Sequence, residues 1–531
     1  MKRPQVDVAI VGAGFAGMYM LHKVRGLGLV GQVVEGGSDV GGTWYWNRYP
    51  GARCDVESME YSYGFDEDLQ QEWEWSERYA PQPEILSYAN HVADRFDLRR
   101  DIRFDTRVTA AVYNDAAATW RVDTDRGEPI TARFVVMATG CLSSANIPDI
   151  AGAESFTGPT YHTGRWPHEG VDFTGLRVGV IGTGSSAVQS IPIIAEQAAH
   201  LTVFQRTATY AVPAWNQPLD PVEQKEIKAD YAGLRTANRQ TASAFGSRQA
   251  RNDMSALEAS DEERLEEFER RWQVGGLGFL GAYTDLLLDA SANELAREFV
   301  LGKLNEVVQD PELAAKLAPD QVIGCKRLCV DTGYWATFNR PNVELVDLRA
   351  TPIETITPTG IRTSAADHDL DAVVYATGFD AMTGALARID IRGRDDLPLA
   401  DAWHAGPRTY LGLTVAGFPN MFIITGPGSP SVLTNMLESI QQHVEWIADC
   451  VDHLRTTGHA TIEATVVAQD QWVDYVNMVA DFTLFPTCNS WYLGANVPGK
   501  TRVFMPLPGF PTYVDQCNDI VADGYRGFAF A

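Results

Sequence analysis

Two short glycine clusters are the residues whose spacing points most directly to chemistry. Gly12, Gly14 and Gly17 match the pattern G-x-G-x-x-G, and residues 182–187 (GTGSSA) match G-x-G-x-x-A. In this pattern the first glycine permits a tight turn, the second lets the backbone approach a pyrophosphate, and the third lets a helix pack on a strand. The amides at the helix N-terminus then face the phosphates. Both clusters therefore predict dinucleotide sites.

The side chains at the end of the following strand distinguish the two predicted sites. The segment Gln32–Val34 ends in Glu35, whose carboxylate accepts hydrogen bonds from ribose hydroxyls but repels a 2′-phosphate. The strand after the second cluster ends in Arg206 and Thr207. A guanidinium grips a phosphate dianion through two parallel hydrogen bonds, so FAD is predicted at the first site and NADPH at the second. The alternative for Arg206 is a solvated arginine at a strand end.

The elements that position these turns follow from the periodicity of the flanking residues. Val6–Val11 is a β-branched run before the first cluster, and Met18–Val24 continues after it with helical spacing. Arg177–Ile181, a helical segment and the strand LTVFQ repeat this order around the second cluster. Two such βαβ units predict an α/β fold with two Rossmann-like domains.

A change of composition after residue 220 predicts a helical insertion. The chain becomes charged and rich in Ala and Leu, and Ser260 or Asp261 is a candidate cap before an acidic helical turn. Strand-like segments return at Val343–Val346 and Ala372–Tyr375, so the insertion is expected to interrupt the second domain. The predicted parts are an FAD-binding domain over 1–148 and 379–531, an NADPH-binding domain over 149–220 and 325–378, and the insertion over 221–324.

The overall composition excludes several kinds of partner. Lys+Arg 43 against Asp+Glu 69 gives a formal net charge of −26 over 531 residues, which repels nucleic acid and anionic membranes. Asp7 interrupts the apolar N-terminal run, so we expect no signal peptide, and no segment has the length of a bilayer span. The seven cysteines lack the paired spacings of a disulfide framework or a zinc site. We predict a cytoplasmic monomer or homodimer without a metal.

Two dinucleotide sites on one chain predict a relay in which hydride passes from a nicotinamide to a flavin. Thiol–disulfide chemistry is one use of a reduced flavin, but no C-x-x-C or C-x-x-x-x-C motif lies near the first cluster. Cys325 and Cys329 are spaced C-x-x-x-C and are interpreted as structural cysteines. Oxygen activation is therefore the favoured chemistry.

Two longer motifs carry a family resemblance. Residues 156–167 (FTGPTYHTGRWP) match the fingerprint F-x-G-x-x-x-H-x-x-x-W-P, and residues 41–55 match [AG]-G-x-W-x-x-x-x-[FY]-P-[GM]-x-x-x-D. The defined fingerprint positions are Phe156, Gly158, His162, Trp166 and Pro167. The chain thus resembles the Baeyer–Villiger monooxygenases, above all their phenylacetone and steroid monooxygenase branch. The resemblance implies conversion of ketones to esters or lactones with NADPH and O₂ through a flavin C4a-peroxide.

The resemblance also implies the catalytic residues. Arg327 corresponds to the family arginine that lies over the flavin, and Asp55 to the aspartate that pairs with it. A permanently charged guanidinium stabilises a peroxide anion and a developing oxyanion without protonating them. His162 and Trp166 are expected on the linker between the domains. For His162 an ordinary hydrogen-bonded linker role is favoured over direct proton transfer, and its family role resembles conformational control.

The other candidate residues come from the motifs and the resemblance together. Trp491 is implied on a mobile loop near 488–505 that closes over NADP⁺ and excludes water. It also joins the implied substrate pocket of Val432, Leu433 and Met436. The FAD-binding candidates are Gly12, Gly14, Phe15, Gly17, Glu35, Gly42, Thr43, Trp44 and Asp55. The NADPH-binding candidates are Gly182, Thr183, Gly184, Ser185, Ser186, Arg206, Thr207, Lys326, Arg327 and Trp491. For Trp44 the alternative is a packed core aromatic.

One departure from the family leaves the substrate open. Residues 507–511 (LPGFP) stand where relatives often have an aromatic residue and two glycines, so we expect a different pocket entrance. Aryl, cyclic and steroid-like ketones all stay candidates. Two rival functions are N- or S-oxygenation, which the fingerprint and Arg327 disfavour, and a non-catalytic NADPH sensor. The sensor needs a partner surface on the insertion, whose charged face is more simply explained by solvation.

Overall fold

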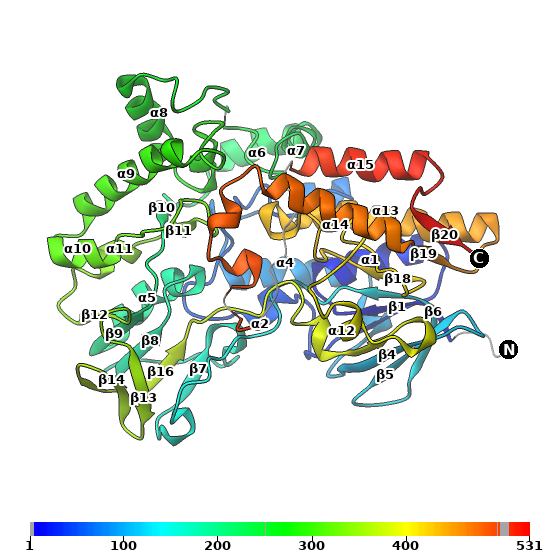
Figure 1. The fold of residues 1–531 in the computed structure, drawn as a ribbon, viewed down its shortest axis with the longest axis horizontal. Coiled ribbons are helices and arrows are strands. Elements are labelled where there is room, and N and C mark those ends of the chain that lie inside the picture. Colours follow the sequence, from blue (N-terminus) through cyan, green and yellow to red (C-terminus); the bar gives the residue numbers. More distant parts are fainter. Residues whose placement is uncertain (1–4, 250, 496, 500–508) are drawn as a thin grey trace.

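Two larger sheets form the framework of the protein (Figure 1). The computed structural model describes residues 5–249, 251–495, 497–499 and 509–531. The first sheet has the strand order β17-β4-β5-β6-β1-β2-β3, and β18 also pairs with β6. Its strands are β1 (Val6–Val11), β2 (Gly31–Val34), β3 (Ile102–Arg103), β4 (Val108–Asn114), β5 (Thr119–Thr124), β6 (Ile130–Met137), β17 (Asp390–Arg392) and β18 (Met421–Ile423).

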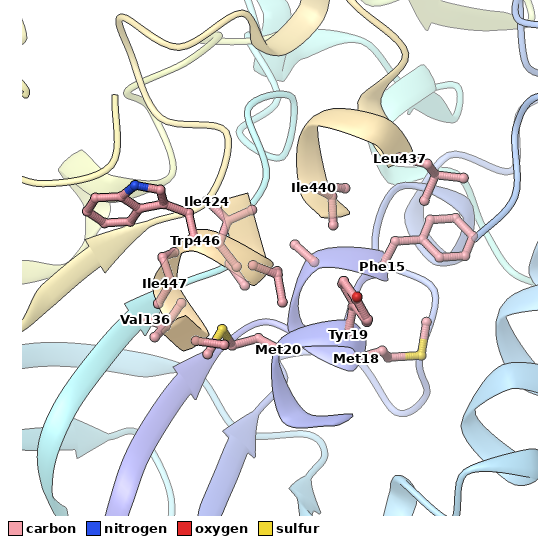
Figure 2. Packing of buried hydrophobic residues seen from close by; sticks show 14 of the residues in the cluster. Phe15, Met18, Tyr19, Met20, Val136, Ile424, Leu437, Ile440, Trp446 and Ile447 are labelled. Carbon is pink, nitrogen blue, oxygen red and sulfur yellow. The ribbon is translucent and has the colours of Figure 1, made fainter. Parts of the chain in front are cut away.

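The hydrophobic core of the first sheet is built from residues of both the N-terminal and the C-terminal part of the chain. Helix α1 (Phe15–Gly26) packs on α13 (Met436–Thr457) over one face of the sheet. Figure 2 shows Tyr19 and Met20 of α1, Ile440 and Ile447 of α13 and Val136 of β6 in one buried cluster. Since β17, β18 and α13 follow the second sheet in the sequence, the prediction of a discontinuous first domain is confirmed.

The second sheet is parallel throughout and has the order β12-β9-β8-β16-β7. Its strands are β7 (Thr160–His162), β8 (Arg177–Ile181), β9 (His200–Gln205), β12 (Val343–Asp347) and β16 (Ala372–Tyr375). Helix α5 (Ser185–Gln197) follows β8 and packs on the sheet. Because β12 and β16 return after the helical segment, the predicted interruption of this domain is confirmed.

The insertion is helical, as predicted, and shares the core of the second sheet. Its helices are α6 (Pro221–Ala229), α7 (Tyr231–Arg239), α8 (Asp261–Val274), α9 (Ala290–Val307) and α10 (Pro311–Leu317). Ser260 caps α8 in a capping box with Glu263, which decides between the two predicted caps. Phe268 of α8 and Val300 of α9 belong to the same buried cluster as Val203 of β9. Helices α8 and α9 are therefore part of the second domain's packing, whereas Tyr231 of α7 belongs to the buried cluster of the first domain.

The remaining helices and strands complete the fold around the two sheets (Figure 1). The further helices are α2 (Thr43–Trp46), α3 (Glu67–Glu72), α4 (Gln82–Arg95), α11 (Tyr334–Thr337), α12 (Leu399–Ala402), α14 (Val466–Ala480) and α15 (Phe510–Ala522). The further strands are β10 (Ala211–Pro213), β11 (Cys329–Asp331), β13 (Ile353–Thr357), β14 (Gly360–Thr363), β15 (Asp367–Asp369), β19 (Ile462–Ala464) and β20 (Phe528–Phe530). Among the described residues, no helix has the length and apolar character needed to cross a membrane.

The chain passes between the two domains twice, and the two passages lie side by side. The amide of Asn146 donates to the carbonyl of Gly378 at 2.9 Å, and the amide of Asp380 donates to Ser144 at 2.8 Å. These bonds form a short antiparallel pairing of two connecting segments. The domains are therefore joined by a double strand, which limits their relative movement more than a single linker does.

We expect Gly17→Ala to destabilise the first domain. A Cβ at residue 17 lies 1.8 Å from the Gly12 carbonyl oxygen, whereas a Cβ at Gly26 of the same helix meets nothing within 4 Å. Gly17→Ala should lower the free energy of unfolding by about 1–3 kcal/mol through overpacking. The control Gly26→Ala should keep or raise it, by up to about 1 kcal/mol. Urea unfolding followed by tryptophan fluorescence measures both, and equal midpoints would contradict the expectation.

Candidate active site

The first glycine turn joins β1 to α1 and is too tightly packed for side chains. Gly12 has a φ of +105°, and a Cβ there lies 2.6 Å from the carbonyl oxygen of Ala138. Gly14 is the N-cap of α1 and faces Gly42, where a Cβ lies 2.8 Å from the Gly14 Cα. The three glycines therefore bring three backbone segments together, and they let a pyrophosphate approach the start of α1.

Glu35, at the end of β2, braces this turn. One carboxylate oxygen accepts from the Ala13 amide and the other from the Gly37 amide, both at 2.7 Å. Burial raises the pKa of the Glu35 carboxyl, and the two amides act in the opposite direction. The carboxylate thus fixes the loop that faces the expected ribose. The sequence motif does not reveal these two hydrogen bonds to the loop amides. The remaining lone pairs of the carboxylate suit ribose hydroxyls.

The aromatic candidates at this site are core residues. Phe15 packs edge-on against Tyr61 and Tyr63, and the Trp44 indole donates to the Tyr61 hydroxyl at 3.2 Å. Both Phe15 and Trp44 belong to the buried cluster of the first domain. Thr43, in contrast, is exposed at the start of α2. The packing of Trp44 in the core therefore positions Thr43 and the neighbouring glycine.

The second glycine turn leaves room where the first does not. Gly182 has a φ of +112°, and a Cβ there lies 2.4 Å from the carbonyl oxygen of Ala376, but a Cβ at Gly184 meets nothing within 4 Å. The Thr183 hydroxyl donates to the Thr207 carbonyl at 2.7 Å and so ties the turn to the end of β9. The open space over Gly184 suits the approach of a pyrophosphate.

Three cations gather beside the second turn. Arg206 is exposed at the end of β9, and its carbonyl accepts from Arg349 Nε at 2.9 Å. Burial lowers the pKa of Lys326, and the nearby Arg206 and Arg349 guanidinium groups lower it further. Asp320 forms an ion pair with Arg349. Arg349 was not among the predicted residues. It follows β12, which pairs with β9, and a basic residue after the neighbouring strand is the sequence signal that could have identified it.

The two predicted catalytic residues form one ion pair. Arg327 Nε donates to Asp55 Oδ2 at 2.8 Å and Nη2 to Oδ1 at 3.0 Å, while Nη1 donates to the Val432 carbonyl at 2.9 Å. Burial lowers the pKa of Arg327, but the Asp55 carboxylate outweighs it, so the pKa lies above its ordinary value. Tyr492 is buried beside the pair. The guanidinium is thus held in one orientation and stays charged.

The four predicted pocket residues meet in one apolar cluster. Val432, Leu433, Met436 and Trp491 pack around a small buried core. Its buried members are Cys141, Ala381, Met382, Val432, Phe485 and Tyr492. Since Val432 also binds Arg327 through its carbonyl, this cluster lies next to the ion pair. Of the predicted loop near 488–505, residues 496 and 500–505 lie outside the described residues, as do Leu507 and Pro508 of the family departure.

The fingerprint histidine lies at the connection between the domains. His162, predicted on the linker between the domains, ends β7, the edge strand of the second sheet. Its Nδ1 accepts from the Gly164 amide at 2.9 Å, and its Nε2 lies 3.4 Å from both the Asn146 carbonyl and the Thr377 hydroxyl. Burial lowers the pKa of His162. A neutral ring that contacts both passages favours the hydrogen-bonded role.

The rest of the fingerprint anchors β7 by packing. Trp166 is buried and contacts the rings of Tyr161 and Phe173. Phe156 packs against a neighbouring apolar cluster, and Pro167 directly follows Trp166. Gly158 permits close approach, because a Cβ there lies 2.6 Å from the Asp371 carbonyl oxygen.

Comparison with known proteins identifies the family. Residues 9–263 match the family described as pyridine nucleotide-disulphide oxidoreductase. A protein named Baeyer–Villiger monooxygenase from Pseudooceanicola batsensis is 44% identical over 525 residues, which cover 98% of this chain and 95% of that protein. The chain belongs to the Baeyer–Villiger monooxygenase family.

Solved structures of the family agree over the whole chain. An oxidised steroid monooxygenase bound to NADP is 53% identical with a TM-score of 0.94, covering 99% of both chains. The complex of OTEMO with FAD and NADP is 41% identical with a TM-score of 0.96, covering 100% of both chains. The two glycine turns of this Baeyer–Villiger monooxygenase thus lie in a fold that holds both nucleotides in a relative.

A further contact connects the signature of residues 41–55 to the second domain of this monooxygenase. The Tyr49 hydroxyl donates to Gln189 Oε1 at 2.8 Å, and Gln189 Nε2 donates to the Arg53 carbonyl at 3.1 Å. Gly51 has a φ of +76°, and a Cβ there lies 2.3 Å from the Gln189 carbonyl oxygen. Gln189, on α5, was not predicted. It holds the segment that ends in Asp55 against the second glycine helix.

One cysteine pair contradicts the expectation from the sequence. Cys325 and Cys488 form a disulfide across a separation of 163 residues. The free cysteines among the described residues are Cys54, Cys141, Cys329, Cys450 and Cys517, and all are buried. Spacing along the chain does not reveal the bond, because pairing requires proximity in space. Cys325, interpreted from the sequence as a structural cysteine, is therefore paired with Cys488 although the spacing of the cysteines does not resemble a disulfide framework.

A double-mutant cycle tests the Tyr49–Gln189 contact. Gln189→Leu leaves the Tyr49 hydroxyl without its acceptor and should cost about 1–2 kcal/mol of unfolding free energy. Tyr49→Phe alone should cost about 1 kcal/mol. The double variant should lose less than the sum, by at least about 0.5 kcal/mol, because the partners share one bond. Chemical unfolding measures the cycle, and strictly additive losses would rule the contact out.

Proposed function

We propose that Arg327 is the catalytic residue of this flavin-dependent Baeyer–Villiger monooxygenase, which converts a ketone to an ester or lactone. FAD and NADPH are the cofactors and O₂ is the cosubstrate. The observation that carries the proposal is the bidentate Asp55–Arg327 pair, which lies beside an apolar cluster through the contact of Arg327 with the Val432 carbonyl. A fixed cation at the edge of an apolar pocket is what oxygen insertion beside a carbonyl requires.

The residues present fit both nucleotides. The glycine cradle of Gly12, Gly14 and Gly42 has no room for a Cβ, and Glu35 lies where a ribose is expected. Bound FAD supplies the hydride acceptor and the centre that activates O₂. We assign the remaining contacts with FAD to Phe15, Gly17, Thr43, Trp44 and Asp55. Because Phe15 and Trp44 are packed in the core, they act by holding the neighbouring backbone in place for FAD.

Arg327 acts on the negative charge that develops on the carbonyl oxygen of the ketone. Its guanidinium cannot give up a proton at neutral pH, so it stabilises an oxyanion without protonating it. Asp55 holds two of its nitrogens and the Val432 carbonyl holds a third. Asp55 is therefore a positioning residue. It keeps the Arg327 guanidinium in one orientation during both flavin reduction by NADPH and oxygen transfer to the ketone.

The preference for NADPH comes from the cations beside the second turn. Arg206, with Thr207 and Lys326, binds the 2′-phosphate, and Arg349 supports them because it holds the Arg206 backbone. The turn itself presents Gly182, Thr183, Gly184, Ser185 and Ser186 to the pyrophosphate. Trp491 covers the nicotinamide side of the site.

The substrate is an apolar ketone with an aryl, alicyclic or steroid-like body. Val432, Leu433, Met436 and Trp491 supply an apolar wall next to Arg327. The similarity to a steroid monooxygenase at 53% identity supports the larger end of this range. The enzyme works on this small molecule in the cytoplasm as a monomer or homodimer, where NADPH is the available reductant.

We predict that Arg327→Ala separates NADPH oxidation from oxygen transfer. The variant should still reduce its flavin with NADPH, but ester formation should fall at least about 100-fold because an oxyanion-stabilising group is lost. The consumed O₂ should appear as hydrogen peroxide. Gas chromatography of the ester and a peroxide assay, run on the same samples with a panel of ketones, measure the two outcomes.

Arg327→Lys is the matched control for charge. It keeps a cation but loses the bidentate pair, so its ester yield should lie between those of the wild type and Arg327→Ala. Unchanged ester yield in Arg327→Ala would remove this residue from catalysis. Turnover of amines or sulfides, with no ester from any ketone, would instead favour N- or S-oxygenation.

Arg206→Ala should weaken NADPH selectively. Loss of a bidentate phosphate contact should raise KM for NADPH by about 10- to 100-fold, corresponding to about 1.4–2.8 kcal/mol, and leave KM for NADH nearly unchanged. Arg126→Ala, an exposed arginine between β5 and β6, is the control and should change neither. Steady-state kinetics with both nucleotides decide the matter; equal effects on both would contradict phosphate recognition.

A further inference from the structure

We infer that Cys325 and Cys488 form a thiol–disulfide modification site that controls closure of the segment carrying Trp491. The inference rests on the proposed function for its consequence, since that segment covers the NADPH site. A peroxide oxidises this site, and a dithiol reduces it.

The disulfide joins the two segments that meet at the active site. Cys325 directly precedes Lys326 and Arg327, and Cys488 lies two residues before Ser490, which caps the short helix Trp491–Leu493. The Cα atoms of the pair are 5.7 Å apart, inside the usual range of about 4.4–6.8 Å. The bond therefore fixes the helix containing Trp491 and Tyr492 to the segment that carries the catalytic cation.

Noncovalent contacts alone hold this segment more weakly. The Leu484 amide donates to the Leu287 carbonyl at 2.9 Å, and Phe485 packs in the apolar cluster with Val432. The hydrogen bonds that define the helix from Trp491 are local ones to Ser490 and Trp491. Among the described residues, the other contacts of this stretch are all noncovalent: the Leu484 backbone bond, the packing of Phe485, and Tyr492 buried against Arg327. Reduction should therefore let the segment open.

The other cysteines do not compete for this chemistry. Burial raises the pKa of the thiols of Cys54, Cys141, Cys329 and Cys450, which disfavours the reactive thiolate. The pair is itself buried, with each cysteine 3% exposed. A reductant therefore reaches it only when the segment opens, so bound NADP⁺ should slow reduction.

The reaction balances with reagents of known class. Two thiols and one H₂O₂ give one disulfide and two H₂O, and the peroxide arises when NADPH and O₂ react without transfer of oxygen to a ketone. A dithiol reverses the change by exchange, and it leaves as its own disulfide. In a cytoplasmic protein such a bond is transient and redox-sensing rather than permanent. Peroxide lost from the site would thus lock the segment that keeps water out.

The test uses the full-length enzyme with FAD, prepared once with hydrogen peroxide and once with dithiothreitol. Mass spectrometry of a non-reducing digest should find the Cys325–Cys488 linked peptides only in the oxidised sample. Stopped-flow displacement should show NADP⁺ leaving the oxidised form about three- to tenfold more slowly, because the tether removes the cost of ordering the segment. Cys325→Ser and Cys488→Ser should behave as the reduced form under both treatments.

A matched control and a cofactor-free readout complete the design. Cys450→Ala removes a buried free thiol of α13 and should keep the redox response. Chymotrypsin should cut after Trp491 or Tyr492 faster in the reduced form than in the oxidised form. This readout decides the inference even if NADPH reduces the flavin in neither form, a result that would defeat the proposed function alone. Absence of the linked peptides, or equal cleavage and NADP⁺ release in both forms, would overturn the inference.

Discussion

The ion pair between Asp55 and Arg327 is the interaction on which the rest of the site depends. Its partners are 272 residues apart and belong to segments next to different nucleotide turns. A guanidinium in a largely buried position is costly unless a carboxylate and hydrogen-bond acceptors surround it, and Asp55 and the Val432 carbonyl meet that need. The pair can form only when the two domains are docked. With the proposed role of Arg327, docking of the domains is a condition of the chemistry as well as of stability.

Several features of the chain maintain this docking. The two passages between the domains pair with one another, and His162 contacts both. Gln189 reaches from α5 to the segment that precedes Asp55. Because the second domain interrupts the first, the first sheet gains β17 and β18 only after all strands of the second sheet have been traversed. The two domains are thus linked by chain topology as well as by contacts, and the fingerprint residue His162 contacts both connecting segments.

The sequence predicted those parts of the molecule that depend on local patterns. The β1 strand, the glycine turns, the Ser260 cap and the interrupted second domain all follow from neighbouring residues. The bracing of the first turn by Glu35, the third cation Arg349 and the Gln189 contact do not, because each depends on a partner distant in the chain. The disulfide is the clearest case, since nothing in the spacing of Cys325 and Cys488 indicates that they meet.

Charge raises a last constraint on the second nucleotide site. The protein has a formal net charge of −26, so its field repels an anionic cofactor at a distance. At physiological ionic strength this repulsion is screened beyond about 8 Å, whereas groups within that range act almost directly. The cluster of Arg206, Lys326 and Arg349 therefore has to reverse the sign of the potential locally. Burial and mutual repulsion disfavour the charge of Lys326, and an incoming phosphate relieves that repulsion. With the proposed binding of the 2′-phosphate, recognition of the phosphate and relief of this repulsion are one event, which accounts for three like charges lying close together.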